Sequence, residues 1–252
     1  MRIYQNAYEL MSEMGRDLWE MGQLVKPKTY QNKVIEGDEQ MQTKELICKQ
    51  YCLTDLPDSK WLFIFSQCKT WADSELWERL NGNAFTNPGI AYKLRSDMWE
   101  QFLNSEGKFD YTYPERLHRI VDEEGNDNLD SVIHLLSNDP DTRKAVLSIY
   151  DAKNDSQYYD GSRRIPCSMY YNFLIREGKV NLVYHQRSSD YVQHFGDDVF
   201  LAWGLMEHVA RELKLPVGYL YHTIDSLHVY KKDWWKLKTD IDDFLPDAKD
   251  IE

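Results

Sequence analysis

Two stripes of hydrophobic residues in the second half of the chain have the spacing of an amphipathic helix. The first follows the polar residues 126–128, which can cap a helix, and consists of Leu129, Val132, Ile133 and Leu136. The second consists of Val199, Trp203, Met206, Ala210 and Leu213. Steps of three and four residues put each set on one helix face. The pattern predicts helices near residues 129–137 and 199–213 that bury these faces in a core.

The first half of the chain has weaker patterns. They predict helices at residues 7–19 and 73–80 and strands at residues 28–35 and 45–53. Residues 81–126 have no regular period, apart from a short helix predicted at 96–103. We expect this part to form long loops around the core.

A two-residue turn, Glu177-Gly178, joins two strand-like segments that start near residue 166 and end near residue 187. Pairing across this turn puts Cys167 opposite Ser188, and Ser168 opposite Arg187, and a bulge would shift the pairing by one residue. The hairpin is therefore predicted to bring a thiol beside a guanidinium and a hydroxyl.

A further strand is predicted at residues 145–150, with the loop 141–144 connecting it to the preceding helix. No internal repeat and no Gly/Ser-rich or Pro-rich linker divides the chain. We therefore expect one domain that spans residues 1–252.

Charge and composition narrow the class of protein. Lys and Arg total 30 against 42 Asp and Glu, a net charge of −12, which disfavours a duplex DNA binder but is compatible with a local basic pocket for one small phosphate. The apolar runs are far shorter than the ~20 residues of a membrane-spanning helix, and the N-terminal residues lack the apolar stretch of a signal peptide. A cytoplasmic protein is expected. The four cysteines form no CxxC pair, so we expect neither a disulfide framework nor a metal site.

Cys167 is the candidate nucleophile because an adjacent arginine favours the thiolate. Two alternatives remain: a small buried strand residue, or a Cys/His hydrolase with His222 or His228 as the base, although no protease signature surrounds the cysteine. The polar run 186–190 offers a guanidinium, hydroxyls and a carboxylate at a strand end, which suits a phosphate. The alternative to a phosphate site is that these residues only form a polar strand end with a local ion pair.

Several motifs together resemble the thymidylate synthase family, over roughly residues 128–234. They are Asn138-Asp139-Pro140-Asp141-Thr142-Arg143-Lys144, Pro166-Cys167, Gln186-Arg187-Ser188-x-Asp190 and His228-Val229-Tyr230. Upstream, the weaker anchors are Glu75-Leu76 and Tyr113. The resemblance implies an α/β (α+β) fold with a bent mixed sheet, flanking helices and a sheet-to-sheet homodimer. It also implies 5,10-methylenetetrahydrofolate as the cofactor and a pyrimidine nucleotide as the substrate.

The same resemblance implies roles for individual residues. Cys167 would attack C6 of the base, and Glu75 would handle protons, with Glu78 as a competitor and an exposed helix acid as the structural alternative. Asp190 would bind the folate. The nucleotide-binding residues would be Arg187, Ser188, His228, Tyr230, Lys28 and, offered across the dimer, Arg143 and Lys144.

One departure from the family pattern concerns the choice of base. Thymidylate synthases have Asn where this chain has Asp198, and a carboxyl suits the amine and ring nitrogen of cytosine. This resembles the deoxycytidylate hydroxymethylases of the family, which are viral enzymes, and Ser168 and the segments 226–230 and 234–236 agree with that branch. We therefore expect hydroxymethylation of dCMP.

Other interpretations remain open. Asp198 is also a natural N-cap for the helix predicted to start near Val199, and Asp197 could take either role. His194 departs from the usual glycine in the preceding loop. The alternative functions are methylation of dUMP by a thymidylate synthase, hydroxymethylation of dUMP or CMP, and non-catalytic nucleotide binding.

Overall fold

The computed structural model describes residues 1–65, 68–82, 87–121, 123–156 and 164–244. Within these ranges the α-helices are α1 Ala7–Met21, α2 Lys69–Leu80, α3 Ser96–Trp99, α4 Tyr113–Leu117, α5 Asn128–Asn138 and α6 Phe195–Glu212. The strands are β1 Arg2–Tyr4, β2 Gln23–Val25, β3 Thr29–Tyr30, β4 Lys33–Val34, β5 Thr43–Leu53, β6 Val146–Ser148, β7 Ser168–Arg176, β8 Lys179–Asp190 and β9 Val217–Tyr230.

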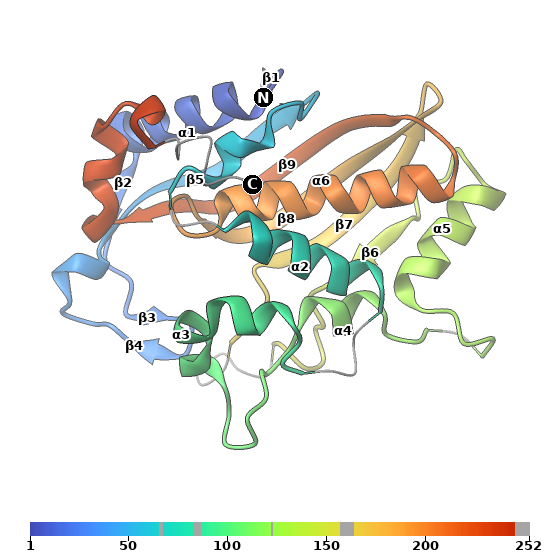
Figure 1. Ribbon diagram of the computed structural model, residues 1–252, viewed down its shortest axis with the longest axis horizontal. Coiled ribbons are helices and arrows are strands. Elements are labelled where there is room, and N and C mark those ends of the chain that lie inside the picture. The colour runs from blue at the N-terminus through green and yellow to red at the C-terminus, as the bar shows by residue number, and fades with distance from the viewer. Residues whose placement is uncertain (66–67, 83–86, 122, 157–163, 245–252) are drawn as a thin grey trace.

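A mixed sheet forms the centre of the described structure. Its strand order is β1-β5-β9-β8-β7-β6, and β2 pairs with β5 beside this path. The pairs β1–β5 and β8–β9 are parallel, while β5–β9, β7–β8 and β6–β7 are antiparallel. Figure 1 shows α6 running along one face of the sheet, with α2 beside it. The predicted mixed sheet with flanking helices is therefore present.

Helix α6 provides much of the buried core. It packs on β8 and β9, and α2 packs on α6. The stripe predicted for this helix is buried at Val199, Trp203, Met206 and Ala210, while Leu213 is partly buried. On the opposite face of the sheet, the side chains of Tyr170, Val183, Tyr219 and Tyr221 remain partly or largely exposed.

The predicted hairpin is formed, with a change at its far end. Arg176 pairs with Lys179, and this register continues to Tyr170 opposite His185. A bulge between Ser168 and Tyr170 then moves Ser168 opposite Gln186. The predicted pairings of Ser168 with Arg187 and of Cys167 with Ser188 are both wrong by one residue, because the bulge inserts an extra position in β7.

The strand predicted at residues 28–35 is also wrong. The segment forms a small hairpin of two-residue strands, β3 and β4, and Gln31 between them has a positive φ of 54°. None of its residues is fully buried, so no buried face holds this segment in a longer strand.

Four of the helices and strands had no sequence prediction: β1, β2, α4 and β9. Helix α4 begins at the N-cap Thr112, whose hydroxyl accepts the backbone N–H of Glu115, with Pro114 in its first turn. Strand β9 is half-buried: Leu220, His222 and Ile224 face the core, while alternate residues are more exposed. The other predicted helices and strands are present with shifted ends.

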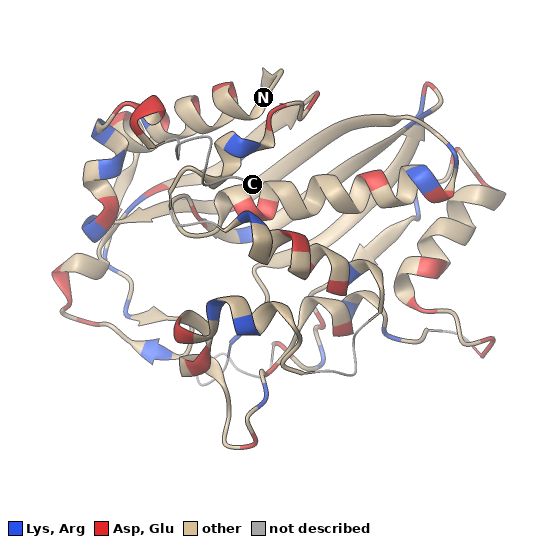
Figure 2. Cartoon of the chain, viewed as in Figure 1, with Lys and Arg blue, Asp and Glu red and all other residues tan. Residues whose placement is uncertain are grey.

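Charged side chains lie mainly on helices and loops, and the middle of the sheet carries few of them (Figure 2). Among the described helices, none combines the length and the apolar character that crossing a lipid bilayer requires.

Close packing at the start of α6 gives a test of the fold. A Cβ added to Gly196 would lie 1.8 Å from the backbone oxygen of Leu62, which cannot rotate away. We expect Gly196→Ala to lower the free energy of unfolding by about 1–3 kcal/mol, measured by urea denaturation.

Gly107→Ala is the control for this substitution. Gly107 has a φ of +70° and no neighbour within 4 Å of an added Cβ. Its substitution should therefore lower the free energy of unfolding by about 1 kcal/mol through backbone strain alone, without a clash. A Gly196→Ala variant as stable as the wild type would contradict the close approach.

Candidate active site

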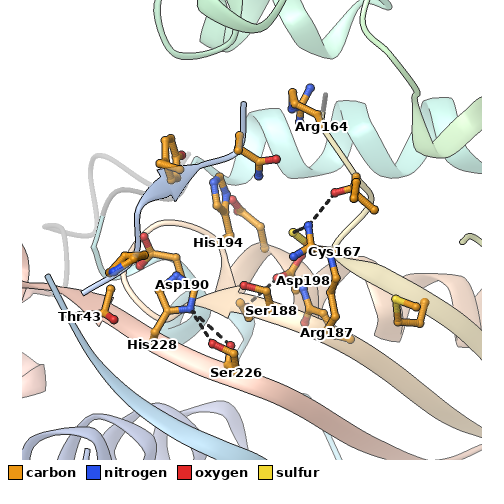
Figure 3. A pocket seen from close by; sticks show the side chains of 18 of the residues that line it. Thr43, Arg164, Cys167, Arg187, Ser188, Asp190, His194, Asp198, Ser226 and His228 are labelled. Atoms are coloured by element: carbon orange, nitrogen blue, oxygen red, sulfur yellow. Dashed lines mark hydrogen bonds between the residues drawn. The ribbon is translucent and has the colours of Figure 1, made fainter. Parts of the chain in front are cut away.

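A cavity of about 660 Å³ lies where β8 and β9 end and α6 begins. Its wall includes seven of the predicted site residues: Cys167, Arg187, Ser188, Asp190, Asp198, His228 and Tyr230. Figure 3 shows side chains from β8, β9, α6 and the segment before β7 gathered around this space. The fold therefore brings together residues that are up to 63 positions apart (167 to 230).

Four predicted residues do not line this cavity: Lys28, Glu75, Arg143 and Lys144. The ammonium of Lys28 lies 3.1 Å from Glu36, and its side chain is 76% exposed. Arg143 and Lys144 are exposed on the loop before β6. Arg143 and Lys144 are therefore accessible to a second protein molecule, whereas Lys28 forms an ion pair at the surface.

Cys167 lies beside Arg187, as the sequence predicted. The Nη2 atom of Arg187 is 3.9 Å from the Cys167 Sγ, and the backbone N–H of Arg187 donates to the Cys167 carbonyl at 2.8 Å. Two further carbonyls, of Ile165 and Pro166, accept hydrogen bonds from the guanidinium. Burial raises the pKa of the Cys167 thiol, and the charge of Arg187 opposes this shift.

Asp198 is not the N-cap of α6. The helix starts at Phe195 with His194 as its N-cap, so Asp198 is in the first turn and its own N–H donates to the His194 carbonyl at 2.8 Å. The Oδ2 atom of Asp198 accepts hydrogen bonds from Gln186 Nε2 at 2.6 Å and from Ser189 Oγ at 2.9 Å. Burial raises the pKa of Asp198 to about 6, although these two hydrogen bonds favour the carboxylate.

A buried hydrogen-bond chain orients Gln186 toward Asp198. His222 Nε2 lies 3.1 Å from the Gln186 Oε1, and His222 Nδ1 lies 2.8 Å from the Tyr51 hydroxyl. Burial lowers the pKa of His222 to about 3, so the ring is neutral and carries one proton. With that proton on Nε2, His222 donates to Gln186 and accepts from Tyr51. The amide nitrogen of Gln186 then faces the Asp198 carboxyl.

Asp190 and His228 meet at the ends of two parallel strands. The residues pair in the register of β8 and β9, and Asp190 Oδ1 accepts the backbone N–H groups of Val192 and Gln193. Burial raises the pKa of Asp190, and nearby His228 opposes the shift. His228 and Tyr230 are two residues apart on one strand face, with ring centroids 5.3 Å apart.

Glu75 is separated from the cavity by an arginine that had no sequence prediction. Arg79 lines the cavity, and its Nε donates to Glu75 Oε1 at 2.9 Å. The Arg79 guanidinium also lies 4.1 Å from the ring centre of Tyr113. The competitor Glu78 accepts the backbone N–H of Ala91 and is buried away from the cavity. Residues four positions apart on a helix lie side by side, so the spacing of Glu75 and Arg79 is the sequence feature that indicates their ion pair.

Asp197, the alternative to Asp198, has a different partner. Its Oδ2 accepts from Arg95 Nη1 at 2.8 Å, and both side chains are buried. Burial raises the pKa of Asp197 to about 7 despite this arginine. No short-range pattern indicated Arg95, because it comes from the irregular part of the chain, 102 residues before Asp197.

Comparison with a solved structure agrees with the predicted fold. The thermostable thymidylate synthase A from Bacillus subtilis superposes with a TM-score of 0.76 at 19% identity, covering 94% of this chain and 84% of that one. The bent mixed sheet with flanking helices is therefore a thymidylate synthase-like fold.

Two relatives are similar in sequence. A protein of Methanothermobacter marburgensis, provisionally named a thymidylate synthase, is 35% identical over 142 residues, which are 55% of this chain and 60% of the relative. The deoxyuridylate hydroxymethyltransferase of Bacillus phage SP01 is 34% identical over 142 residues, 53% of this chain and 37% of the relative. The chain thus matches between about a third and three fifths of these relatives' length, and neither is named a deoxycytidylate hydroxymethylase.

A family model covers a larger part of the sequence. The model described as thymidylate synthase matches residues 81–244, well over half of the chain. This chain therefore belongs to the thymidylate synthase family.

Proposed function

We propose that this protein transfers a one-carbon unit to C5 of a pyrimidine nucleoside monophosphate. The observation that carries the proposal is the position of the Cys167 thiol, 3.9 Å from the Arg187 guanidinium, in a cavity that also contains Asp198. Membership of the thymidylate synthase family supports the same activity.

Cys167 would act as the nucleophile. Its thiolate forms a bond to C6 of the base, and the electron pair of the C5–C6 double bond makes C5 nucleophilic. After C5 has bonded to the one-carbon unit, loss of the C5 proton would release tetrahydrofolate and leave a methylene group on C5. In hydroxymethylation, water would add to this methylene as the sulfur–C6 bond breaks, which restores the C5–C6 double bond and the free cysteine. The nearby positive charge of Arg187 favours the thiolate needed for the first step.

The proposed proton carrier is Glu75. Because its carboxylate contacts Arg79 and not the cavity, this role requires proton exchange through water or rearrangement of the ion pair.

Nucleotide binding would use several sides of the cavity. Arg187 and Ser188 offer a guanidinium nitrogen and a hydroxyl to the phosphate, and His228 and Tyr230 offer donors to the sugar. The exposed Arg143 and Lys144 would reach the phosphate of a partner subunit. A homodimer formed through the exposed sheet face that carries Tyr219 is compatible with this arrangement.

The cavity also fits the folate cofactor. Asp190 has one oxygen held by backbone donors, which leaves a carboxylate to accept from the N–H groups of a pteridine, and Trp71 and Trp99 provide flat apolar walls. When bound, 5,10-methylenetetrahydrofolate would supply the one-carbon unit.

Asp198 supports cytosine as the base, and the resemblance of the surrounding segments to deoxycytidylate hydroxymethylases supports hydroxymethylation as the reaction. Its carboxyl can accept from the cytosine amine and share a proton with the ring nitrogen N3. The named relatives favour uracil instead, because the phage SP01 protein is a deoxyuridylate hydroxymethyltransferase. Methylation or hydroxymethylation of dUMP is therefore the second candidate.

The first test supplies dCMP, CMP and dUMP separately with methylenetetrahydrofolate and identifies the products by mass spectrometry. We expect 5-hydroxymethyl-dCMP with wild type, and no product with Cys167→Ala because the addition to C6 is lost. Nucleotide affinity of the variant should stay within about tenfold, since phosphate contacts are separate.

Cys48→Ala, which removes an exposed thiol, is the matched control and should keep full activity. Dihydrofolate among the products would indicate methylation. Normal turnover by Cys167→Ala would disprove the covalent mechanism.

The second test concerns the shared arginine. We expect Arg143→Ala and Cys167→Ala homodimers to be inactive, and a heterodimer of the two to recover about half the wild-type activity because one of its two sites is intact. Two affinity tags allow the heterodimer to be purified and assayed. An inactive heterodimer would argue against sharing of Arg143.

The third test concerns Asp198 and pH. Below about pH 6 the carboxyl is protonated and offers both a donor and an acceptor, while above this pH the carboxylate only accepts. Cytosine N3 is a stronger base than uracil O4, so it retains the shared proton at higher pH. The preference for dCMP over dUMP in kcat/KM should therefore rise between about pH 5 and about pH 8.

Asp198→Asn should remove this pH dependence. It should also lower the ratio of kcat/KM for dCMP to kcat/KM for dUMP roughly ten- to a hundredfold. The reason is that the amide fits uracil and leaves the cytosine amine facing another amine. A ratio that neither the substitution nor pH changes would remove Asp198 from base recognition.

A further inference from the structure

Arg164 is a buried arginine without an acidic partner among the described residues. Its side chain lies in the cavity wall, only 7% of the residue is exposed, and its Nε is buried without a hydrogen-bond partner. Its backbone N–H donates to Asp110 Oδ2 at 3.1 Å. The charge of the guanidinium is therefore not compensated by an ion pair within the described structure.

Aromatic rings surround this guanidinium. Its central carbon lies 4.8–5.6 Å from four ring centres, those of Trp99, Phe102, Phe109 and Tyr111. Such contacts attract a cation and fix its orientation, but they do not replace the hydrogen bonds that water would accept from its N–H groups. An oxygen acceptor that enters the cavity would therefore bind here more strongly than at a hydrated surface arginine.

The other arginines near this position differ from Arg164. A second cavity of about 310 Å³ shares Arg164 and Tyr111 with the first. There, Arg116 pairs with Asp155 at 2.9 Å, and Arg119 pairs with Asp151 at 2.6 Å. Arg187 has two backbone carbonyl acceptors. Among these four described arginines, Arg164 is the one whose side-chain nitrogens have no acceptor, whereas Arg187 keeps one nitrogen, Nη1, for the phosphate.

The position of Arg164 indicates which reactant it meets. Figure 3 shows Cys167 between Arg164 and Arg187, with Ser188 on the Arg187 side and His194 between Arg164 and Asp190. The phosphate is proposed to bind Arg187 and Ser188, so Arg164 belongs to the other part of the cavity. That part contains Trp99, whose ring centre is 5.8 Å from that of His194.

We propose that Arg164 anchors the folate by donating hydrogen bonds to one of its oxygen acceptors, either the pteridine carbonyl or a carboxylate of the glutamate tail. This inference rests on the proposed function. The four rings hold the guanidinium in place before the cofactor binds, which reduces the entropy lost on binding. Arg164 then complements Asp190, which accepts hydrogen bonds from the same molecule.

The test measures binding and not turnover. Tetrahydrofolate is titrated by calorimetry into protein saturated with nucleotide, for the wild type and for Arg164→Met, which keeps an unbranched apolar side chain against the rings. We expect the folate Kd to rise about ten- to a hundredfold and the nucleotide Kd to change less than about twofold. Arg164→Lys should recover part of the loss, because it keeps the charge without the planar fork.

Arg211→Met is the matched control, since this arginine is 69% exposed at the end of α6 and its loss changes the net charge equally. Thermal denaturation checks that each variant is folded, and Arg164→Gln replaces Arg164→Met if the latter does not fold. Repeating the titration with tetrahydropterin, which has the pteridine carbonyl but no carboxyl group, distinguishes the two acceptors. A loss with both ligands indicates the pteridine carbonyl, and a loss with tetrahydrofolate alone indicates the tail.

An unchanged folate Kd in the folded Arg164 variants would overturn the inference, as would a loss that falls on the nucleotide. Neither result affects the proposed function, which fails instead if wild-type protein neither binds folate nor modifies any of the nucleotides.

Discussion

Strand β8 is hydrogen-bonded to a neighbour on each side, antiparallel to β7 and parallel to β9, and the positions of the site residues depend on this pairing. The Glu177-Gly178 turn determines the register at one end, and the other end carries Gln186–Asp190 into the cavity. Because β9 runs parallel to β8, its own polar end arrives at the same edge, with His228 paired to Asp190. A slip of one residue would turn these side chains to the other face.

Asp197 and Asp198, two neighbouring buried acids of the cavity, have different hydrogen-bond partners. Asp197 has an arginine partner, whereas Asp198 has the neutral donors Gln186 and Ser189. Burial raises both pKa values, to about 7 and about 6, so each carboxyl can exchange a proton near neutral pH. The neutral ring of His222 keeps Gln186 in one orientation, so the hydrogen-bond donors to Asp198 are neutral groups.

Charge is distributed differently over the chain and within the cavity. The chain carries a net charge of −12, yet Arg79, Arg164 and Arg187 all line the same internal space. An acidic protein repels long polyanions, whereas low-dielectric walls strengthen the attraction of a local positive charge for a small anion. The same cavity is also lined by Glu45, Asp190, Asp197 and Asp198, so positive charge is local to the arginines and cannot be inferred from the overall composition.

Periodicity and turn geometry in the sequence determined the main helices, the hairpin and the grouping of polar residues at the end of β8, because these depend on residues a few positions apart. The family motifs identified seven residues of the cavity wall through their resemblance to a known family and not through local periodicity. Tertiary structure alone decided the partners of each charge: Arg79 withdraws Glu75 from the cavity, and Gln186, not a helix end, orients Asp198. Among the described residues, the Arg164 guanidinium likewise contacts rings from distant segments and no acid, since packing between remote segments determines which buried charges find a partner.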